Sequence, residues 1–422
     1  MRIGIDDTDS PEGMCTTYLG AVLLRRLQNA GMTVGEARLI RLNPNVIYKT
    51  RGNAAICLDV SGDQEDAFRI ACQTVDELAD LPCENTNPGV VVTSRKPPGE
   101  FYRQAVTGFC ELKDAISILE ETGAYFKGYK NQRGLIGATA AVCSELPDRT
   151  FELLAYRTPA RWGTPRDVDG GSLFLAEEAT FPDTWDSVDR DNRCVVCVPH
   201  TPDPVLFGIR GASPQSVSLA RSYVRSELPA IEQIFLTNQG TDAHLLDGAI
   251  GQLLEGCSYR VPGVVSSKPE TGPGGHVSVT LAGYDGEPGG LRCMAYEPTK
   301  GFRHVIRQLL PGDRLVAVGS YKAGSLNLEK ILIIDLSAAS VRRPPQCPVC
   351  DRRMTSAGSG KGYKCRVCSG RSGEPVEEPL ERRLSCGWYE VPPSARRHLA
   401  RPLCRGTAVH HEERELHADL LR

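Results

Sequence analysis

The sequence predicts a multidomain α+β protein whose second half contains a small β-barrel and a zinc-binding module. Alternating strand and helix patterns fill the first half, five short strand patterns follow, and two Cys-x-x-Cys pairs stand near the end. With 422 residues, of which 41% are hydrophobic and 24% charged, the chain is long enough for several separate cores. We therefore expect four domains.

The first predicted domain, residues 1–115, alternates strands with helices in an α/β arrangement. Short apolar runs indicate the strands, and apolar residues three or four positions apart indicate the helices. Such alternation is typical of helices layered on a sheet. The predicted strands are residues 2–5, 38–42, 54–60 and 89–93, and the predicted helices begin at Tyr18 and cover 65–78.

The second predicted domain, residues 116–258, is α+β. Cys194 and Cys197 are spaced like half of a metal site, but no second pair lies near them in the sequence, so core packing is the favoured interpretation. The predicted helices lie near residues 112–122 and at 213–226, and the predicted strands at 135–142 and 150–156.

The third predicted domain, residues 259–340, has five short strands with one helix between the third and the fourth. That order is the OB-fold arrangement, a small barrel that commonly binds oligonucleotides. A purely structural barrel is the alternative, because a fold alone does not establish a function. The predicted strands are residues 263–267, 276–282, 291–296, 315–319 and 330–336, and the predicted helix is 301–310.

The fourth predicted domain, residues 341–422, is a zinc ribbon followed by a charged tail. Fourteen residues separate two Cys-x-x-Cys pairs, and glycines between them allow tight turns. Four thiolates fill a tetrahedral shell, so the zinc should be structural; four unrelated cysteines are the alternative. We expect the residues from Val409 to be loosely ordered or helical. The predicted zinc ligands are Cys347, Cys350, Cys365 and Cys368.

The charges are distributed unevenly. The net charge is −3, yet residues 341–406 contain fourteen Lys and Arg against six Asp and Glu. A basic module predicts a polyanionic partner that is held through its phosphates, although such charges can also serve only solubility. The cations expected to make these contacts are Arg342, Arg343, Arg352, Arg353, Lys361, Lys364, Arg366, Arg371, Arg396, Arg397 and Arg401.

Nothing in the sequence indicates secretion or a membrane. Three acids stand among the first nine residues, where a secretory signal would need an apolar run, and no apolar stretch of about 18 residues occurs. We expect a cytoplasmic protein with no membrane partner. The cysteines outside the two pairs should be reduced and mostly buried.

An acidic cluster follows the first predicted strand directly. Asp6, Asp7 and Asp9 offer hard carboxylate oxygens at a strand end, which suits Mg²⁺ with phosphate and water in the rest of its shell. The alternative is an acidic turn that caps the next helix. The residues alone do not separate the two interpretations.

Two threonines and a polar loop could accompany that cluster. Thr16 and Thr17 stand at a predicted helix start, where free backbone N–H groups favour phosphate, although either could be a plain N-cap. No P-loop pattern occurs at this point. The later loop carries Lys49, Arg51 and Asn53, which could neutralise triphosphate oxygens or form a solvated connector.

Several strings resemble the archaeal tRNA(Ile)-2-agmatinylcytidine synthetase family, in order from residue 1 to about 405. The tail from Thr407 is not part of the resemblance. The strings are Asp6-Asp7-Thr8-Asp9-Ser10, Gly13-Met14-Cys15-Thr16-Thr17-Tyr18-Leu19, Arg41-Leu42-Asn43-Pro44, Tyr48-Lys49-Thr50-Arg51-Gly52-Asn53, Asn87-Pro88-Gly89-Val90, Arg133-Gly134-Leu135-Ile136-Gly137-Ala138 and Thr237-Asn238-Gln239-Gly240-Thr241-Asp242.

The resemblance implies an architecture and an activity. The expected domains are a kinase-like domain, a ferredoxin-like domain, an OB fold and a zinc ribbon. The implied enzyme is an ATP-dependent ligase that attaches agmatine to C2 of the wobble cytidine of tRNA(Ile) with a CAU anticodon, which changes decoding from AUG to AUA. ATP is consumed to AMP and pyrophosphate, and a phosphoryl group activates the cytosine O2.

The resemblance also implies site residues and cofactors. Thr16 matches a threonine that becomes phosphorylated, and Asp6, Asp7 and Asp9 match the family's clustered aspartates. ATP, Mg²⁺ and a structural Zn²⁺ are the expected cofactors; tRNA and agmatine are the expected partners, and DNA is not. A non-catalytic single-strand-binding protein and an enzyme that uses another amine, such as lysine, are the competing hypotheses.

Overall fold

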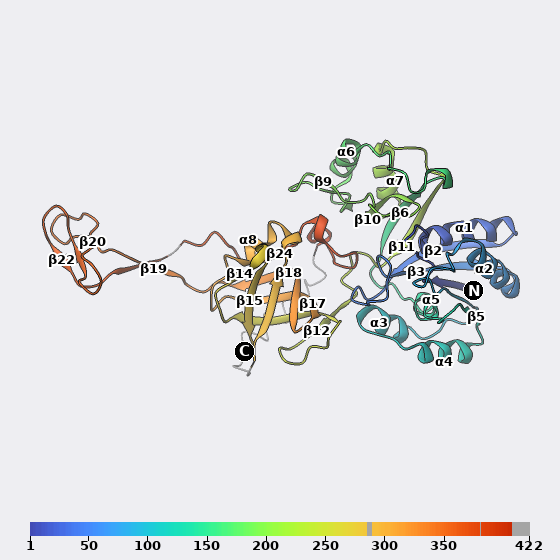
Figure 1. Ribbon diagram of the computed structural model, residues 1–422, viewed down its shortest axis with the longest axis horizontal. Helices are drawn as coiled ribbons and strands as arrows, with labels where there is room; N and C mark the ends of the chain where they lie inside the picture. The colour runs from blue at the N-terminus through green and yellow to red at the C-terminus, as the bar shows by residue number, and fades with distance from the viewer. Residues whose placement is uncertain (285–288, 380, 407–422) are drawn as a thin grey trace.

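The computed structural model describes residues 1–284, 289–379 and 381–406, and its shape is elongated (Figure 1). A nine-stranded sheet with its helices lies at one end, a closed barrel lies in the middle, and a small cysteine-bearing module projects on a thin two-stranded stalk. The expected tail from Val409 lies outside the described residues. Within the described ranges, no helix is long and apolar enough to cross a membrane.

The first part of the chain builds five strands of the large sheet. β1 pairs antiparallel with β3 on one side and with β4 on the other. The order β5-β4-β1-β3-β2 therefore places β1 in the middle of this half. The strands are β1 (Arg2–Asp6), β2 (Thr33–Arg41), β3 (Ala54–Ser61), β4 (Gly89–Thr93) and β5 (Tyr125–Gly128).

Helices cover both faces of this half, because successive strand residues point to opposite faces. In β3, Ile56 and Leu58 pack with α1 and α2, whereas Ala55 and Cys57 pack with α3, α4 and α5. The result is a three-layer α/β/α body. The helices are α1 (Thr16–Asn29), α2 (Gln64–Leu78), α3 (Glu100–Thr107), α4 (Leu112–Thr122) and α5 (Gly134–Val142).

Helix α5 occupies the run predicted to be a strand at residues 135–142, so that prediction was wrong. The run is apolar on all sides and rich in small residues, and it carries no period that separates a buried helix from a buried strand. Small residues let the helix lie directly on β1 and β4. A Cβ added to Gly4 would lie 2.3 Å from the carbonyl oxygen of Ala138, and one added to Gly89 would lie 2.2 Å from the carbonyl carbon of Gly134.

The second part of the chain extends the same sheet. β11 pairs antiparallel with β6 and parallel with β2, which joins the strand order β11-β6-β10-β7 to the first half. Helices α6 and α7 pack together on this part (Figure 1). The elements are β6 (Thr150–Tyr156), α6 (Gly170–Thr180), β7 (Thr184–Trp185), β10 (Val205–Gly211), α7 (Pro214–Tyr223) and β11 (Ile231–Thr237), with a small hairpin of β8 (Val188–Asp189) and β9 (Cys194–Val195).

The two cysteines of the hairpin region differ in environment. Cys197 is partly buried and packs against the core of this part, as the sequence favoured. Cys194 is exposed, so core packing was wrong for this residue. Within the described ranges, the one metal-like cluster of His, Cys, Asp or Glu includes neither of them.

The middle of the molecule is a closed five-stranded barrel. Its strands follow one another around the barrel as β13-β15-β16-β18-β17 and back to β13, and α8 lies between the third and fourth of them in sequence. The elements are β12 (Leu245–Asp247), β13 (Ser258–Val265), β14 (Glu270–Thr271), β15 (Val277–Ala282), β16 (Leu291–Ala295), α8 (Phe302–Ile306), β17 (Arg314–Lys322) and β18 (Ser325–Asp335).

A stalk carries the cysteine-bearing module away from the barrel. β19 (Ser340–Arg343) pairs with β23 (Val376–Pro379), and the short strands β20, β21 and β22 form a separate sheet beyond them. These three strands are Thr355–Ser356, Tyr363–Lys364 and Arg371–Ser372. The module contacts the rest of the molecule through its stalk (Figure 1).

After the stalk, the chain returns to the barrel and then to the large sheet. β24 (Gly387–Glu390) pairs with β18, and two short 3-10 turns follow at Pro393–Ala395 and Leu403–Arg405. This returning segment, residues 391–406, lies between the barrel and the sheet (Figure 1, red). The backbone N–H groups of Gly240 and Thr241 donate to the carbonyl oxygens of His398 and Leu399.

Two arginines of the returning segment hold it in place, which corrects their expected role as phosphate contacts. Arg396, whose side chain is 5% exposed, forms ion pairs with Asp186 and Glu390. Arg401 forms an ion pair with Asp148, with 2.6 Å between Nη1 and Oδ2. These side chains are used inside the protein, so they are not available to a polyanion.

Candidate functional site

The predicted site residues surround one cleft at the end of β1. The cleft has a volume of about 320 Å³ and lies between α5, the end of α3 and the loop that joins β2 to β3. Thr17 and Arg51 are not among its lining residues. The predicted residues that line it are Asp6, Asp7, Asp9, Thr16, Lys49 and Asn53.

The carboxylate of Asp6 lies against helix α5. A Cβ added to Gly137 would lie 1.8 Å from its Oδ2, so the absence of a side chain at Gly137 makes room for this carboxylate. Burial raises the pKa of Asp6 well above its ordinary value, and the neighbouring charge of Asp7 raises it further. A cation bound here would reverse that effect.

Asp7 is held by an arginine. Arg133 donates from Nε to Oδ2 at 2.9 Å and from Nη2 to Oδ1 at 3.1 Å, a bidentate pair. Burial raises the pKa of Asp7 to about 7, although Arg133 lowers it. The guanidinium of Arg133 also lies 5.5 Å from the ring centre of Tyr48 at the mouth of the cleft.

Asp9 organises the start of α1. Its Oδ1 accepts from the backbone N–H of Thr16 at 2.5 Å and from the Thr16 hydroxyl at 2.8 Å. The Thr8 hydroxyl donates to the same Thr16 oxygen at 3.0 Å. The Thr16 hydroxyl therefore sits between a donor and a carboxylate that can accept its proton.

Neither threonine is the N-cap of α1 within the described residues. Cys15 holds that position without a side-chain cap, and Asp9 accepts from the N–H of Thr16, the first residue of the helix. Thr17 is buried, and its hydroxyl lies 2.9 Å from Cys15 Sγ rather than in the cleft. Of the two hydroxyls, only that of Thr16 lies beside a cleft carboxylate.

The loop residues take different positions. Lys49 lines the cleft and donates to the carbonyl of Pro44. Asn53 also lines it and donates to the carbonyl of Asn43 at 3.0 Å. Arg51 lies behind Asp9, with 3.3 Å between Nη2 and Oδ2, and it donates to the carbonyls of Ser10 and Met14.

The donor set suits magnesium through one or two carboxylates rather than three. Among the described residues, the one group of metal-binding atoms that all lie within 4.8 Å of one another is made of cysteines, so Asp6, Asp7 and Asp9 do not converge on a single point. Mg²⁺ commonly takes one or two carboxylates and completes its octahedron with water and substrate phosphates. With Asp7 paired to Arg133 and Asp9 to Thr16, Asp6 is the carboxylate best placed for a cation.

Sequence reasoning missed several residues that line the cleft. Arg133 and Gly137 lie in one of the strings that carry the family resemblance, but the strand predicted at residues 135–142 is a helix, so their position at the cleft was not predicted. Tyr48 and Phe109 are 65% and 52% exposed at the cleft, although both are large aromatic side chains. An exposed aromatic residue between polar loop residues was the signal that could have identified Tyr48.

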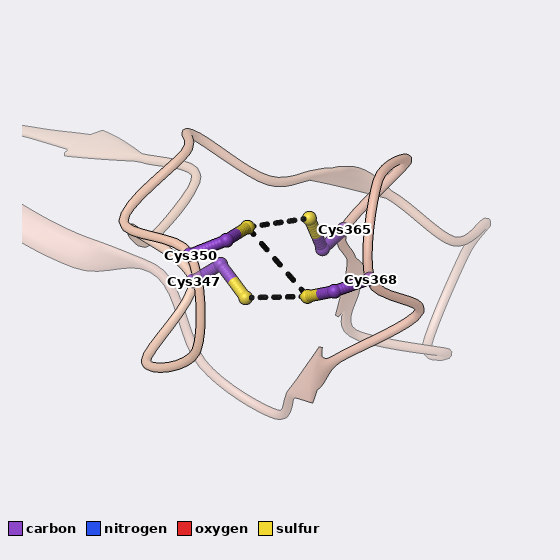
Figure 2. A group of neighbouring side chains, drawn as sticks. All are labelled: Cys347, Cys350, Cys365 and Cys368. Atoms are coloured by element: carbon purple, nitrogen blue, oxygen red, sulfur yellow. Dashed lines mark hydrogen bonds between the residues drawn. The ribbon is translucent and has the colours of Figure 1, made fainter.

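The four predicted zinc ligands come together in the stalked module. Figure 2 shows their sulfur atoms pointing toward one another from two loops. The Sγ–Sγ distances are 3.2 Å for Cys347 and Cys368, 3.5 Å for Cys350 and Cys365, and 3.6 Å for Cys350 and Cys368. Tetrahedral zinc with Zn–S bonds of about 2.3 Å needs sulfurs about 3.8 Å apart, so the cluster is close to the required size.

One thiol of the cluster has a lowered pKa, which favours its ionisation. The backbone N–H groups of Cys368 and Val367 lower the pKa of Cys365 to about 6, with Val367 N lying 3.4 Å from its sulfur. A thiolate is the form that binds zinc. The cluster thus confirms the four-cysteine site that the spacing predicted.

The basic residues of the module divide into two groups. Arg342, Arg343 and Arg353 form ion pairs with Glu377 and Glu378 on the stalk. A second group is exposed and belongs to no ion pair within the described residues. This group is Arg352, Lys361, Lys364, Arg366 and Arg371.

Comparison with known proteins agrees over nearly the whole chain. Residues 2–131 match the model of the TiaS TCKD domain, residues 132–244 that of the TiaS FLD domain, and residues 344–384 that of the TiaS C-terminal zinc ribbon domain. A protein of Methanocorpusculum labreanum named as the tRNA(Ile)-2-agmatinylcytidine synthetase TiaS is 52% identical over 406 residues, which cover 96% of this chain and 97% of that protein.

Solved structures are similar over the same extent. The crystal structure of TiaS in complex with its isoleucine tRNA and ATP is 41% identical with a TM-score of 0.87, over 96% of this chain and 97% of that one. That of TiaS with the same tRNA, AMPCPP and agmatine is 39% identical with a TM-score of 0.85, over 97% and 98%. These matches confirm the resemblance drawn from the motifs: the chain belongs to the TiaS family, the tRNA(Ile)-2-agmatinylcytidine synthetases.

Proposed function

We propose that this chain attaches agmatine to C2 of the wobble cytidine of tRNA(Ile) with a CAU anticodon, at the expense of ATP. One observation carries the proposal: the cleft with its aspartates and Thr16 belongs to a chain that matches, over nearly its full length, a structure solved with an isoleucine tRNA, an ATP analogue and agmatine. The reaction consumes ATP to AMP and pyrophosphate: a phosphoryl group taken from ATP activates the cytosine O2, the amine nitrogen then displaces that oxygen from C2, and the oxygen leaves bound to phosphorus.

The strand orders support the domain assignments that we propose. In the second part, the order β11-β6-β10-β7 with α6 and α7 between strands is that of a ferredoxin-like domain. In the barrel, the order β13-β15-β16-β18-β17 with α8 after the third strand is that of an OB fold. The kinase-like domain precedes them and the zinc ribbon follows, with divisions near residues 258 and 340, and we place the first division after residue 142 instead of near 115. Because β5 and α5 pack on β4 and β1, residues 125–142 lie with the first domain.

In this proposal, the aspartates bind the metal and line the place where the phosphates react. Asp6 is the first candidate ligand for Mg²⁺, and Asp7 and Asp9 complete the acidic wall. When bound, the metal neutralises phosphate oxygens as charge develops during phosphoryl transfer. The protein groups position the phosphates and exclude water from the reacting atoms.

Thr16 is the proposed phosphoryl acceptor, with Asp9 as its base. The hydroxyl donates to the Asp9 carboxylate at 2.8 Å, a distance at which a proton can pass as the oxygen attacks phosphorus. Lys49 and Asn53 are proposed to bind triphosphate oxygens, and Arg51 holds Asp9 in place. Thr17 contributes the backbone N–H of the second helical position rather than its hydroxyl.

The cytosine substrate explains the need for activation. Its O2 is a poor leaving group until it is phosphorylated, after which an amine can replace it at C2. The wobble base must leave its stack, at little cost because the anticodon loop is single-stranded. Agmatine is dicationic and suits a cleft with carboxylates and aromatic faces.

The activity is tested by nucleoside analysis of the product. The full-length chain is incubated with tRNA(Ile) bearing a CAU anticodon, ATP and equal amounts of agmatine and lysine, and the digested tRNA is analysed by mass spectrometry. We expect 2-agmatinylcytidine at the wobble position and no product without ATP. Lysidine instead of the agmatine product would favour the competing amine, and no modified cytidine would reject the proposal.

The metal assignment is tested by Asp6→Asn. The substitution keeps the size of the side chain but removes the charge, so product formation should fall roughly 100-fold or more, whereas tRNA affinity should stay close to that of the wild type. The control is Asp66→Asn, an exposed carboxylate on α2. Normal turnover in Asp6→Asn, or a selective loss of tRNA binding, would contradict the assignment.

The phosphoryl acceptor is tested by comparing Thr16→Val with Thr17→Val. Valine keeps the shape of threonine without its hydroxyl, so only Thr16→Val should abolish covalent phosphate after incubation with ATP. Peptide mass spectrometry measures the modification. Phosphate that persists in Thr16→Val and disappears in Thr17→Val would show that the choice within the pair is wrong.

The zinc assignment is tested by elemental analysis and by Cys365→Ser. We expect one zinc per chain in the wild type and none in the variant, with local unfolding of the stalked module because metal binding supplies its folding free energy. The barrel should remain folded, since the module contacts it through the stalk. An intact wild-type chain without zinc would contradict the prediction.

A further inference from the structure

A second, basic cleft adjoins the acidic one. It has a volume of about 230 Å³ and shares Leu42, Lys49, Gly52 and Asn53 with its neighbour. None of the described residues that line it is Asp or Glu. Its polar wall comes from the end of β2, the loop after it and the returning segment, and consists of Arg41, Lys49, Arg51, Asn53, Arg397 and His398.

Gly52 leaves a space that these side chains border. A Cβ at this position would lie 2.7 Å from Nη1 of Arg41 and 3.3 Å from Nε2 of His398. Gly52 is not among the residues with a positive φ, so its backbone does not require glycine. The missing side chain therefore opens room beside two nitrogen donors.

Several nitrogen donors of this wall have N–H groups left for further hydrogen bonds. Nε of Arg41 is buried and has no hydrogen-bond partner within the described residues. Within the described residues, Arg41 forms its ion pair with Glu152, at 3.6 Å, and that carboxylate also faces Arg210 and Gln239. Lys49 carries three N–H groups and donates to the carbonyl of Pro44.

His398 presents a neutral donor to the cleft. Nη2 of Arg210 lies 2.6 Å from Nδ1 of His398, and Oε1 of Gln239 lies 3.0 Å from the same atom. Because a guanidinium can only donate and its contact is the shorter one, Nδ1 is the acceptor. The proton is then on Nε2, which faces Gly52. Burial lowers the pKa of His398 well below its ordinary value, and Arg41, Arg210 and Lys49 lower it further.

Arg397 is the cation that the returning segment adds. Its Nη1 donates to Oδ1 of Asn45 at 2.9 Å, and its Nε lies 3.4 Å from Oε1 of Glu329. The side chain is nevertheless 33% exposed at the cleft. Arg397 and Lys49 lie close enough for Arg397 to lower the pKa of Lys49, after burial as the first cause. Like charges held together without an acidic wall favour an anion.

We propose that the basic cleft binds a phosphate group of a substrate, and that Arg397 and His398 are positioning residues that complete it. The inference rests on the proposed function, which supplies two phosphate-bearing substrates. The phosphate belongs either to ATP or to the RNA backbone beside the wobble nucleotide, and both would hold the reacting groups against the adjoining acidic cleft. The two ends of the chain thus build one reaction site.

The test uses the full-length chain and two probes, ATP with Mg²⁺ and an anticodon stem-loop RNA with a CAU loop. Arg397→Gln removes the charge. His398→Asn keeps an acceptor for Arg210 but removes the Nε2 proton. We expect both variants to bind one of the two probes with an affinity lower by on the order of tenfold or more, as for the loss of a charge-assisted hydrogen bond. If the probe is RNA, Arg397→Gln should also flatten the slope of log affinity against log salt by about 0.7.

Controls separate this role from a structural one. Arg25→Gln removes an exposed arginine of α1 that lines neither cleft, and Arg397→Lys keeps the charge; both should retain the affinity for each probe. Thermal melting identifies any variant that is merely unfolded. Loss confined to ATP assigns the triphosphate, and loss confined to RNA assigns the backbone phosphate. Wild-type affinity for both probes in folded Arg397→Gln and His398→Asn would overturn the inference.

That outcome is distinguishable from failure of the proposed function. A wild-type chain that makes 2-agmatinylcytidine, with variants that bind both probes normally, rejects only the phosphate cleft. A wild-type chain that makes no product rejects the proposed function, whatever the variants bind.

Discussion

The anchoring of the returning segment is the constraint on which the arrangement of this protein depends. Arg396 and Arg401 pair with carboxylates of the large sheet's second part, and Lys330 of the barrel donates to Asp242 at 2.6 Å. The pairs of Arg396 and Lys330 are buried and therefore costly to break, because removal of one partner leaves an uncompensated charge, whereas Asp148 is 39% exposed. They fix the barrel against the sheet and place residues 397–399 at the basic cleft.

The two neighbouring clefts are lined by side chains of opposite charge. The acidic cleft gathers carboxylates whose pKa values rise with burial, which suits a cation, while the basic cleft gathers nitrogen donors without an acidic wall. A nucleotide–metal complex and an RNA strand both carry charges that match such a pair of neighbouring surfaces. The exposed cations of the stalked module lie far from both clefts along the molecule, where a long RNA can reach them (Figure 1).

Much of the fold could be predicted because its local patterns are strong. β4, α4 and β6 begin and end at the predicted residues, and the four cysteines meet as their spacing predicted. The five barrel strands occur in the predicted order, although β13 begins at Ser258 instead of 263 and β18 at Ser325 instead of 330. Helix α5 could not be predicted, since a small apolar run has no period once both faces are buried. Helix α6 was missed for another reason: Leu175 is 54% exposed whereas Glu177 is buried, so the polarity of its residues does not mark the buried face.

The site was only partly predictable because its geometry depends on distant segments. Asp6, Asp9 and Thr16 are neighbours in sequence, and they meet in the cleft as expected. Arg133 reaches Asp7 across 126 residues, and His398 reaches the same region from the far end of the chain. Arg396 and Arg401 were predicted to contact RNA but form ion pairs within the protein. A count of charges in the sequence cannot distinguish these two roles.

The proposed reaction requires ATP to activate the cytosine O2 before agmatine replaces it, and oxygen labelling shows where that oxygen goes. A tRNA whose wobble cytidine carries ¹⁸O at O2 is converted with ATP and agmatine, and the released products are analysed by mass spectrometry. The account predicts that the label leaves the nucleoside and appears in a phosphate-containing product, because the phosphorylated oxygen departs with its phosphorus. Label released as water would contradict it.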